Sequence, residues 1–133
     1  MVVPVNKEPM NFGNFMEEAY GFSEAVKVGD TIYVSGQTAF GDDGTIAGLD
    51  DMKVQMRAAY AGIERALGMY GATMDAVVDE TLFVTDMTAA VTVANEVRKE
   101  VYGGKFEMAS TLCEIKALGS PQLLIEIKCT ARV

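Results

Sequence analysis

The residue that most suggests chemistry is a carboxylate within an apolar segment near the C-terminus. From Ile125 to Val133 apolar and polar residues alternate, and Glu126 lies within this segment. Burying a carboxylate costs free energy unless it is paired, hydrated or placed at a cleft. Glu126 therefore forms a salt bridge, with Lys128 or with a cation of a neighbouring subunit, or it serves a function. Desolvation would raise its pKa, which suits a general base that activates water.

Few other side chains are available for catalysis. The absence of histidine excludes histidine triads and zinc–histidine sites. Cys113 and Cys129 lie in alternating segments without Cys-x-x-Cys spacing, as expected of free thiols in a reducing compartment. No pair of acidic residues has the geometry of a calcium loop. We therefore expect catalysis, if there is any, from carboxylates, hydroxyls, amides or thiols, with no metal and no cofactor.

Strand hydroxyls and cations are weaker candidates. Ser110 and Thr111 could donate hydrogen bonds to a ligand, although strand hydroxyls mostly bond to local partners. Lys128 and Arg132 share a strand face with Glu126 and could bind an anion there. The alternative is that both cations belong to a solvated strand end.

Length and charge limit the class of protein. The 133 residues, 50% hydrophobic and 23% charged, predict one globular domain over residues 1–133. The net charge of −8 disfavours a nucleic-acid partner, because phosphate backbones are bound by clustered cations. Apolar runs are far shorter than the roughly 20 residues needed to span a bilayer, and the N-terminus does not resemble a secretory signal. We expect no membrane partner and a cytoplasmic location.

The periodicity predicts alternating strands and helices. Two β-branched runs, residues 22–28 and 31–37, flank a Gly-Asp pair and predict a hairpin. The further predicted elements are a helix over 51–70 capped by Asp50 or Asp51, a strand over 77–85, a helix starting at 86–88 with its apolar stripe reaching Val101, and strands over 108–115 and 122–133.

This order predicts an α+β sandwich in which two helices cover one face of a mixed β-sheet. The other face would carry Leu124, Glu126, Lys128 and Thr130 on the last strand. Such a mixture is too polar for a dry core and too apolar for a plain solvated surface. We therefore expect the open face to contact another subunit.

Three segments of the sequence resemble a known family. They are residues 22–37, which end in Ser-Gly-Gln, residues 80–87 and residues 124–128. Together they resemble the reactive intermediate deaminase family (Rid, or YjgF-like), whose members are also labelled L-PSP endoribonucleases. The resemblance implies a chorismate-mutase-like fold and a homotrimer with a small-molecule ligand in clefts between subunits. It also implies hydrolysis of enamines and imines, such as 2-aminoacrylate, to keto acids and ammonia.

Some site residues of the family have direct counterparts in this sequence. Glu126 matches the glutamate proposed in the family to position the hydrolytic water, and Gly36 matches the glycine of the Ser-Gly-Gln phrase. Phe22 stands where the family usually has tyrosine, so a hydroxyl is lost. The family's helix asparagine corresponds to Ala94, and Asn95 follows it. An amide contact therefore requires a shift of one residue.

The largest difference from the family lies at the arginine that binds the substrate carboxylate in that family. Counting back from Glu114 places Ser110 at that position and Leu112 at the position of the family's cysteine. A serine offers one neutral hydrogen bond in place of a bidentate ion pair. The sequence therefore predicts weak or absent 2-aminoacrylate turnover and a larger cleft for a bulkier, neutral or only partly polar ligand.

Two functions are compatible with the sequence. One is a small-molecule hydrolase or deaminase that acts on an enamine, imine or related metabolite with Glu126 as base. The other is a non-catalytic trimeric module that binds a small ligand or a protein partner in the same clefts. Substitution of Glu126 separates them, because only an enzyme would lose turnover.

Overall fold

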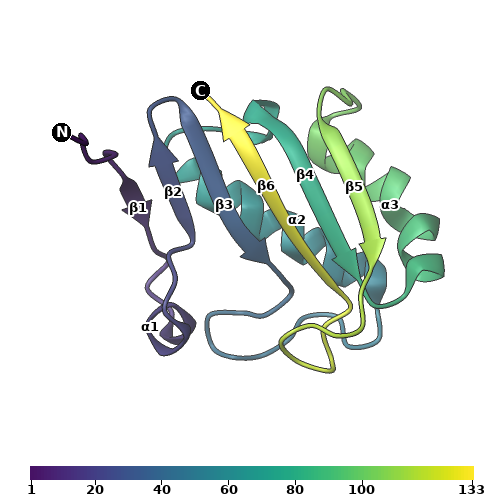
Figure 1. Cartoon of the computed structure of the whole chain (residues 1–133). Coiled ribbons are helices and arrows are strands. Elements are labelled where there is room, and N and C mark those ends of the chain that lie inside the picture. The colour runs from purple at the N-terminus through teal and green to yellow at the C-terminus, as the bar shows by residue number, and fades with distance from the viewer.

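The computed structural model describes all residues, 1–133, and contains the predicted strands and helices together with three short additional elements. The elements in chain order are β1 (Glu8–Met10), α1 (Phe15–Tyr20), β2 (Ala25–Val28), β3 (Thr31–Gln37), α2 (Met52–Gly68), the 3-10 turn η1 (Met74–Ala76), β4 (Val77–Val84), α3 (Met87–Tyr102), β5 (Ala109–Glu114) and β6 (Ile125–Arg132) (Figure 1). β1, α1 and η1 were not predicted.

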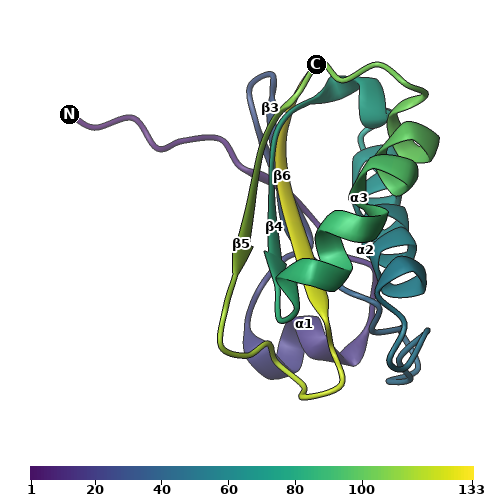
Figure 2. The ribbon, with the colours of Figure 1, turned by 90° about the vertical axis from the view of Figure 1, so that its right-hand side faces the viewer.

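The strands form one mixed sheet in the order β1-β2-β3-β6-β4-β5. β4 and β5 are parallel and are joined by α3, whereas the other neighbouring strands are antiparallel. α2 and α3 lie side by side against one face of the sheet, and Figure 2 shows that no helix covers the central strands on the other face. The predicted α+β sandwich is confirmed.

The helices begin where acidic caps satisfy their free backbone N–H groups. The Asp51 carboxylate accepts from the backbone N–H of Val54, and the Asp86 carboxylate accepts from that of Ala89. α3 ends at Gly103, whose φ of 64° is left-handed and favours glycine. α2 ends at Gly68, earlier than predicted.

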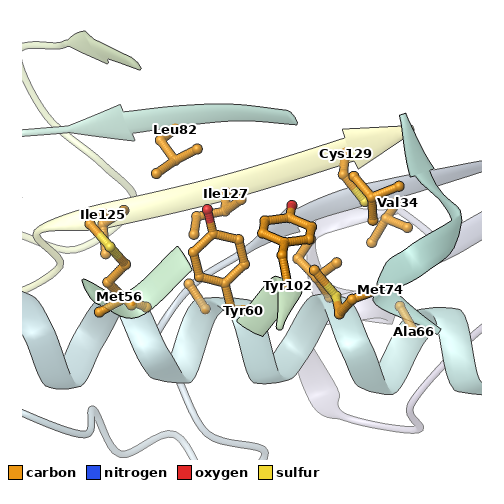
Figure 3. Packing of buried hydrophobic residues seen from close by; sticks show 14 of the residues in the cluster. Val34, Met56, Tyr60, Ala66, Met74, Leu82, Tyr102, Ile125, Ile127 and Cys129 are labelled. Carbon is orange, nitrogen blue, oxygen red and sulfur yellow. The ribbon is translucent and has the colours of Figure 1, made fainter. Parts of the chain in front are cut away.

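The core lies between the sheet and these two helices (Figure 3). Ile125, Ile127, Cys129 and Ala131 of β6 point into it, while the alternate residues of that strand face the open side. None of the helices is long and apolar enough to span a membrane.

Candidate active site

A cavity of about 820 Å³ lies at one end of the molecule, where β3 leaves the sheet. Its walls come from α1, from the loop after β3, from the middle of α2 and from the loop before β6. In Figure 1 α1 and the two loops lie in the lower part of the molecule, and α2 runs behind β3 and β6. Phe22, Gly36 and Glu126, three of the predicted site residues, all line this cavity.

Glu126 enters the cavity from the open side of the sheet. It pairs across strands with Phe83 and is half-buried. Burial raises the pKa of the Glu126 carboxyl, opposed only by the charge of Lys128, and no hydrogen bond from the chain reaches its oxygens. The sheet therefore holds this carboxylate partly desolvated and without a partner.

The Gly36 backbone lies directly against this carboxylate. A Cβ atom at position 36 would lie 2.3 Å from Glu126 Oε2 and 2.6 Å from Cδ. The strand register is interrupted between Val34 and Gln37, which brings the Gly36 backbone against the carboxylate. A side chain here would displace the Glu126 carboxylate from its present position.

A second buried carboxylate, Glu24, lies in the cavity wall. Gln37 Nε2 donates to Glu24 Oε1 at 3.1 Å, and Asn14 Nδ2 donates to Oε2 at 3.3 Å. Burial is the largest effect and raises the pKa of Glu24; nearby Glu17 raises it further, while the two amide donors lower it. Gly62 of α2 lets Gln37 pack closely, because a Cβ there would lie 2.6 Å from Gln37 Oε1.

One cation, Arg65 of α2, lines the cavity. Its Nη1 lies 3.0 Å and 3.2 Å from the two carboxylate oxygens of Asp42, and its guanidinium lies 3.9 Å from the centre of the Phe12 ring. Sequence analysis did not single out Arg65, since nothing in a helical stripe shows that a loop carboxylate and an N-terminal aromatic ring will meet it.

The structure places Ser110 and Leu112 on the helix side of β5. Ser110 pairs with Glu80 in the parallel β4–β5 ladder, and its hydroxyl donates to Glu80 Oε2 at 2.6 Å. Arg98 of α3 donates to the Ser110 oxygen at 2.7 Å. Leu112 packs against the core. Both residues therefore face the helices, and neither lines the cavity.

Strand alternation determines which residues of β5 face the open side. A shift of one residue moves every side chain of a strand to the opposite face. Thr111 and Cys113 therefore occupy the open side of β5, in the same rows as Thr81 and Phe83. Cys113 shares its row with Glu126 through Phe83, two strand spacings or about 10 Å away.

The remaining predicted residues do not reach the cavity within the chain. Asn95 is exposed on α3, and Ala94 beside it is buried in the core. Arg132 forms an ion pair with Asp30, at 2.9 Å, next to the β2–β3 turn. Cys129 is buried, and this burial raises the pKa of its thiol to about 12, so it is no nucleophile.

A buried polar cluster between the sheet and the helices was also missed. Glu80 is 1% exposed, and its carboxylate accepts from the Tyr60, Tyr102 and Ser110 hydroxyls and from Arg98 Nε. Figure 3 shows both tyrosine rings pointing from the helices toward the sheet. The signal was present in the sequence, because Glu80 shares its strand face with Leu82 and Val84.

These features define a class of protein: a mixed sheet with two helices on one face and an acidic, aromatic cavity at its edge. The family model described as Endoribonuclease L-PSP matches residues 13–133, and the chain belongs to this family, also called YjgF or Rid.

Individual relatives agree with this assignment. The RutC family protein YjgH of Escherichia coli (strain K12) is 35% identical over 80 residues, which are 57% of this chain and 60% of that protein. The mitochondrial protein mmf2 of Schizosaccharomyces pombe is 28% identical over 130 residues, 97% of this chain and 96% of that protein. The crystal structure of Rv2704 from Mycobacterium tuberculosis, a member of the YjgF/YER057c/UK114 family, superposes with a TM-score of 0.83 at 34% identity, covering 96% of this chain and 100% of that one.

Proposed function

We propose that this protein is a small-molecule hydrolase of the deaminase type that adds water to the C=N bond of an imine, or of the imine tautomer of an enamine. The observation that carries the proposal is the Glu126 carboxylate, which is half-buried, faces the cavity and has no hydrogen-bond partner in the chain. Its lone pairs are therefore free to orient a water molecule. Membership of the family supports a deaminase-like or small-molecule-binding role.

The proposed reaction conserves atoms and charge. Glu126 accepts a proton as the water oxygen bonds to the iminium carbon, and the C=N π pair moves to nitrogen. The protonated Glu126 then passes that proton to the nitrogen of the carbinolamine. The C–N bond breaks as the hydroxyl oxygen forms the carbonyl. The hydroxyl proton leaves by way of Glu126 to ammonia, so that iminium and water give a carbonyl compound and ammonium. A raised carboxyl pKa suits each of these proton transfers.

We propose that 2-aminoacrylate is not the preferred substrate. The open face of β5 presents Ala109, Thr111 and Cys113, none of which carries a positive charge. A small carboxylate would therefore lack the bidentate partner that binds it in related proteins. We also propose a cytoplasmic homotrimer whose subunits meet on the open face of the sheet.

The test uses imines made in the same cuvette. A flavin amine oxidase supplies a carboxylate-free imine from an arylalkylamine, an L-amino-acid oxidase supplies 2-imino acids, and carbonyl formation is followed with and without this protein. We expect acceleration that falls about 100-fold in Glu126→Gln. The rate should also fall as pH is lowered through the raised pKa of Glu126, because protonation removes the base.

Asp75→Asn serves as the matched control, because Asp75 is exposed on η1 and does not line the cavity. It should retain full activity. Unchanged turnover in Glu126→Gln would refute the role of Glu126. The absence of acceleration for every imine would leave the binding-module alternative as the function.

A further inference from the structure

The cavity combines aromatic walls with an excess of carboxylates. Of the six phenylalanines and five tyrosines of the chain, Phe12, Phe15, Tyr20, Phe22 and Phe40 line it. Phe15, Tyr20 and Phe22 are 54%, 78% and 38% exposed, so a ligand can reach each of them. Aromatic rings attract cations electrostatically through the negative potential of their faces.

Charge in the cavity is strongly one-sided. Glu24, Asp42, Asp43 and Glu126 line it, and Arg65 is the single basic residue that does. Arg65 is already paired with Asp42 at 3.0 Å, so a ligand carboxylate would have to compete with Asp42 for it. None of the remaining carboxylates forms an ion pair, and Lys128, whose charge acts on Glu126, does not line the cavity.

The contacts of Arg65 also show how this wall accepts a positive charge. Its guanidinium lies 3.9 Å above the Phe12 ring while Asp42 binds its edge. Phe22 and Glu126 offer a ligand the same pair of chemical groups, an aromatic ring and a carboxylate, elsewhere on the cavity wall. That carboxylate is half-buried, so a cation brought near it would meet less screening by water than at an exposed residue.

We infer that the cavity selects an organic cation, an iminium or amidinium-like group carried on an apolar or aromatic body, in preference to a carboxylate. The cationic nitrogen lies toward Glu126 and the apolar body lies against the aromatic wall. This inference rests on the proposed function and specifies its substrate class, since an iminium is the protonated form of the C=N bond to be hydrolysed.

The test compares three probes of nearly equal shape: benzamidinium, benzamide and benzoate. Isothermal titration calorimetry at low salt should give at least tenfold tighter binding for benzamidinium than for benzoate, with benzamide between them. Glu126→Gln should reduce the preference for benzamidinium at least threefold, whereas Asp75→Asn should leave it unchanged.

Three results would overturn the inference: tighter or equal binding of benzoate, binding of none of the probes, or an equal loss of preference in Asp75→Asn and Glu126→Gln. The outcome is separate from that of the turnover assay. Benzamidinium selectivity without imine hydrolysis would support the cation site and refute the hydrolase. Imine hydrolysis with a preference for benzoate would do the reverse.

Discussion

Glu80 and Glu126 lie on neighbouring strands, β4 and β6, but on opposite faces of the sheet, and their surroundings differ completely. Glu80 is enclosed by two tyrosine hydroxyls, a serine hydroxyl and Arg98, which lies 3.0 Å away as an ion pair. Glu126 has no hydrogen-bond partner, and burial raises its pKa. A buried carboxylate with all its lone pairs satisfied joins elements of the fold, whereas one without partners remains available to water or a ligand.

The cluster around Glu80 joins four elements of the structure. Tyr60 comes from α2, Tyr102 and Arg98 come from α3, Ser110 comes from β5 and Glu80 itself belongs to β4. The two tyrosine rings meet edge to face at 5.9 Å. The pKa of both hydroxyls is raised, first by burial and then by Glu80, so both stay protonated as donors.

The largest expected effect follows from removing the carboxylate of this cluster. Glu80→Ala removes the acceptor of the half-buried Arg98 and of two buried tyrosine hydroxyls, and we expect a loss of about 3–5 kcal/mol in the free energy of unfolding. Urea denaturation followed by circular dichroism measures it. Glu64→Ala, an exposed position on the same helix as Tyr60, is the control. A loss below about 1 kcal/mol in Glu80→Ala would contradict the structural role.

The two faces of β5 provide the next test. Thr111→Arg places a guanidinium on the open face, and we expect affinity for pyruvate to rise roughly ten- to a hundred-fold, as about 1.5–3 kcal/mol for a charge-assisted bond implies. Ser110→Arg instead forces a second guanidinium beside Arg98, so it should destabilise the fold and gain no affinity. Calorimetric titration with pyruvate measures the affinity of both variants. If the affinity for pyruvate rose in Ser110→Arg but not in Thr111→Arg, the sequence-based assignment of Ser110 to the family's arginine position in the cleft would be supported instead.

These contrasts show what the sequence could predict. The hairpin, α2, α3 and β4–β6 follow from periodicity and from the caps Asp51 and Asp86, which are local signals. β1 has only 3 residues and α1 has 6, too few for a period to be recognised. The family and the fold class were likewise predictable from short sequence segments.

The site was only partly predictable. Phe22, Gly36 and Glu126 lie in or at the ends of the sequence segments that carry the family resemblance, and the structure brings them to one cavity. Ser110 and Leu112 depended on counting back four residues from Glu114, where an error of one residue changes the face of the strand. The contacts of Arg65 with Asp42 and Phe12 join segments that are distant in the sequence. No local sequence pattern predicts such contacts.

The central claim is that Glu126 is held partly desolvated and unpartnered in the folded protein. An NMR titration of the side-chain carboxyl carbons, with the Glu126 resonance assigned by its absence in Glu126→Gln, tests this most directly. We predict that Glu126 titrates at a higher pH than an ordinary glutamate, because burial favours its neutral form and only Lys128 opposes this. Titration at or below the ordinary value would contradict the claim, since it would mean that the carboxylate is solvated or paired.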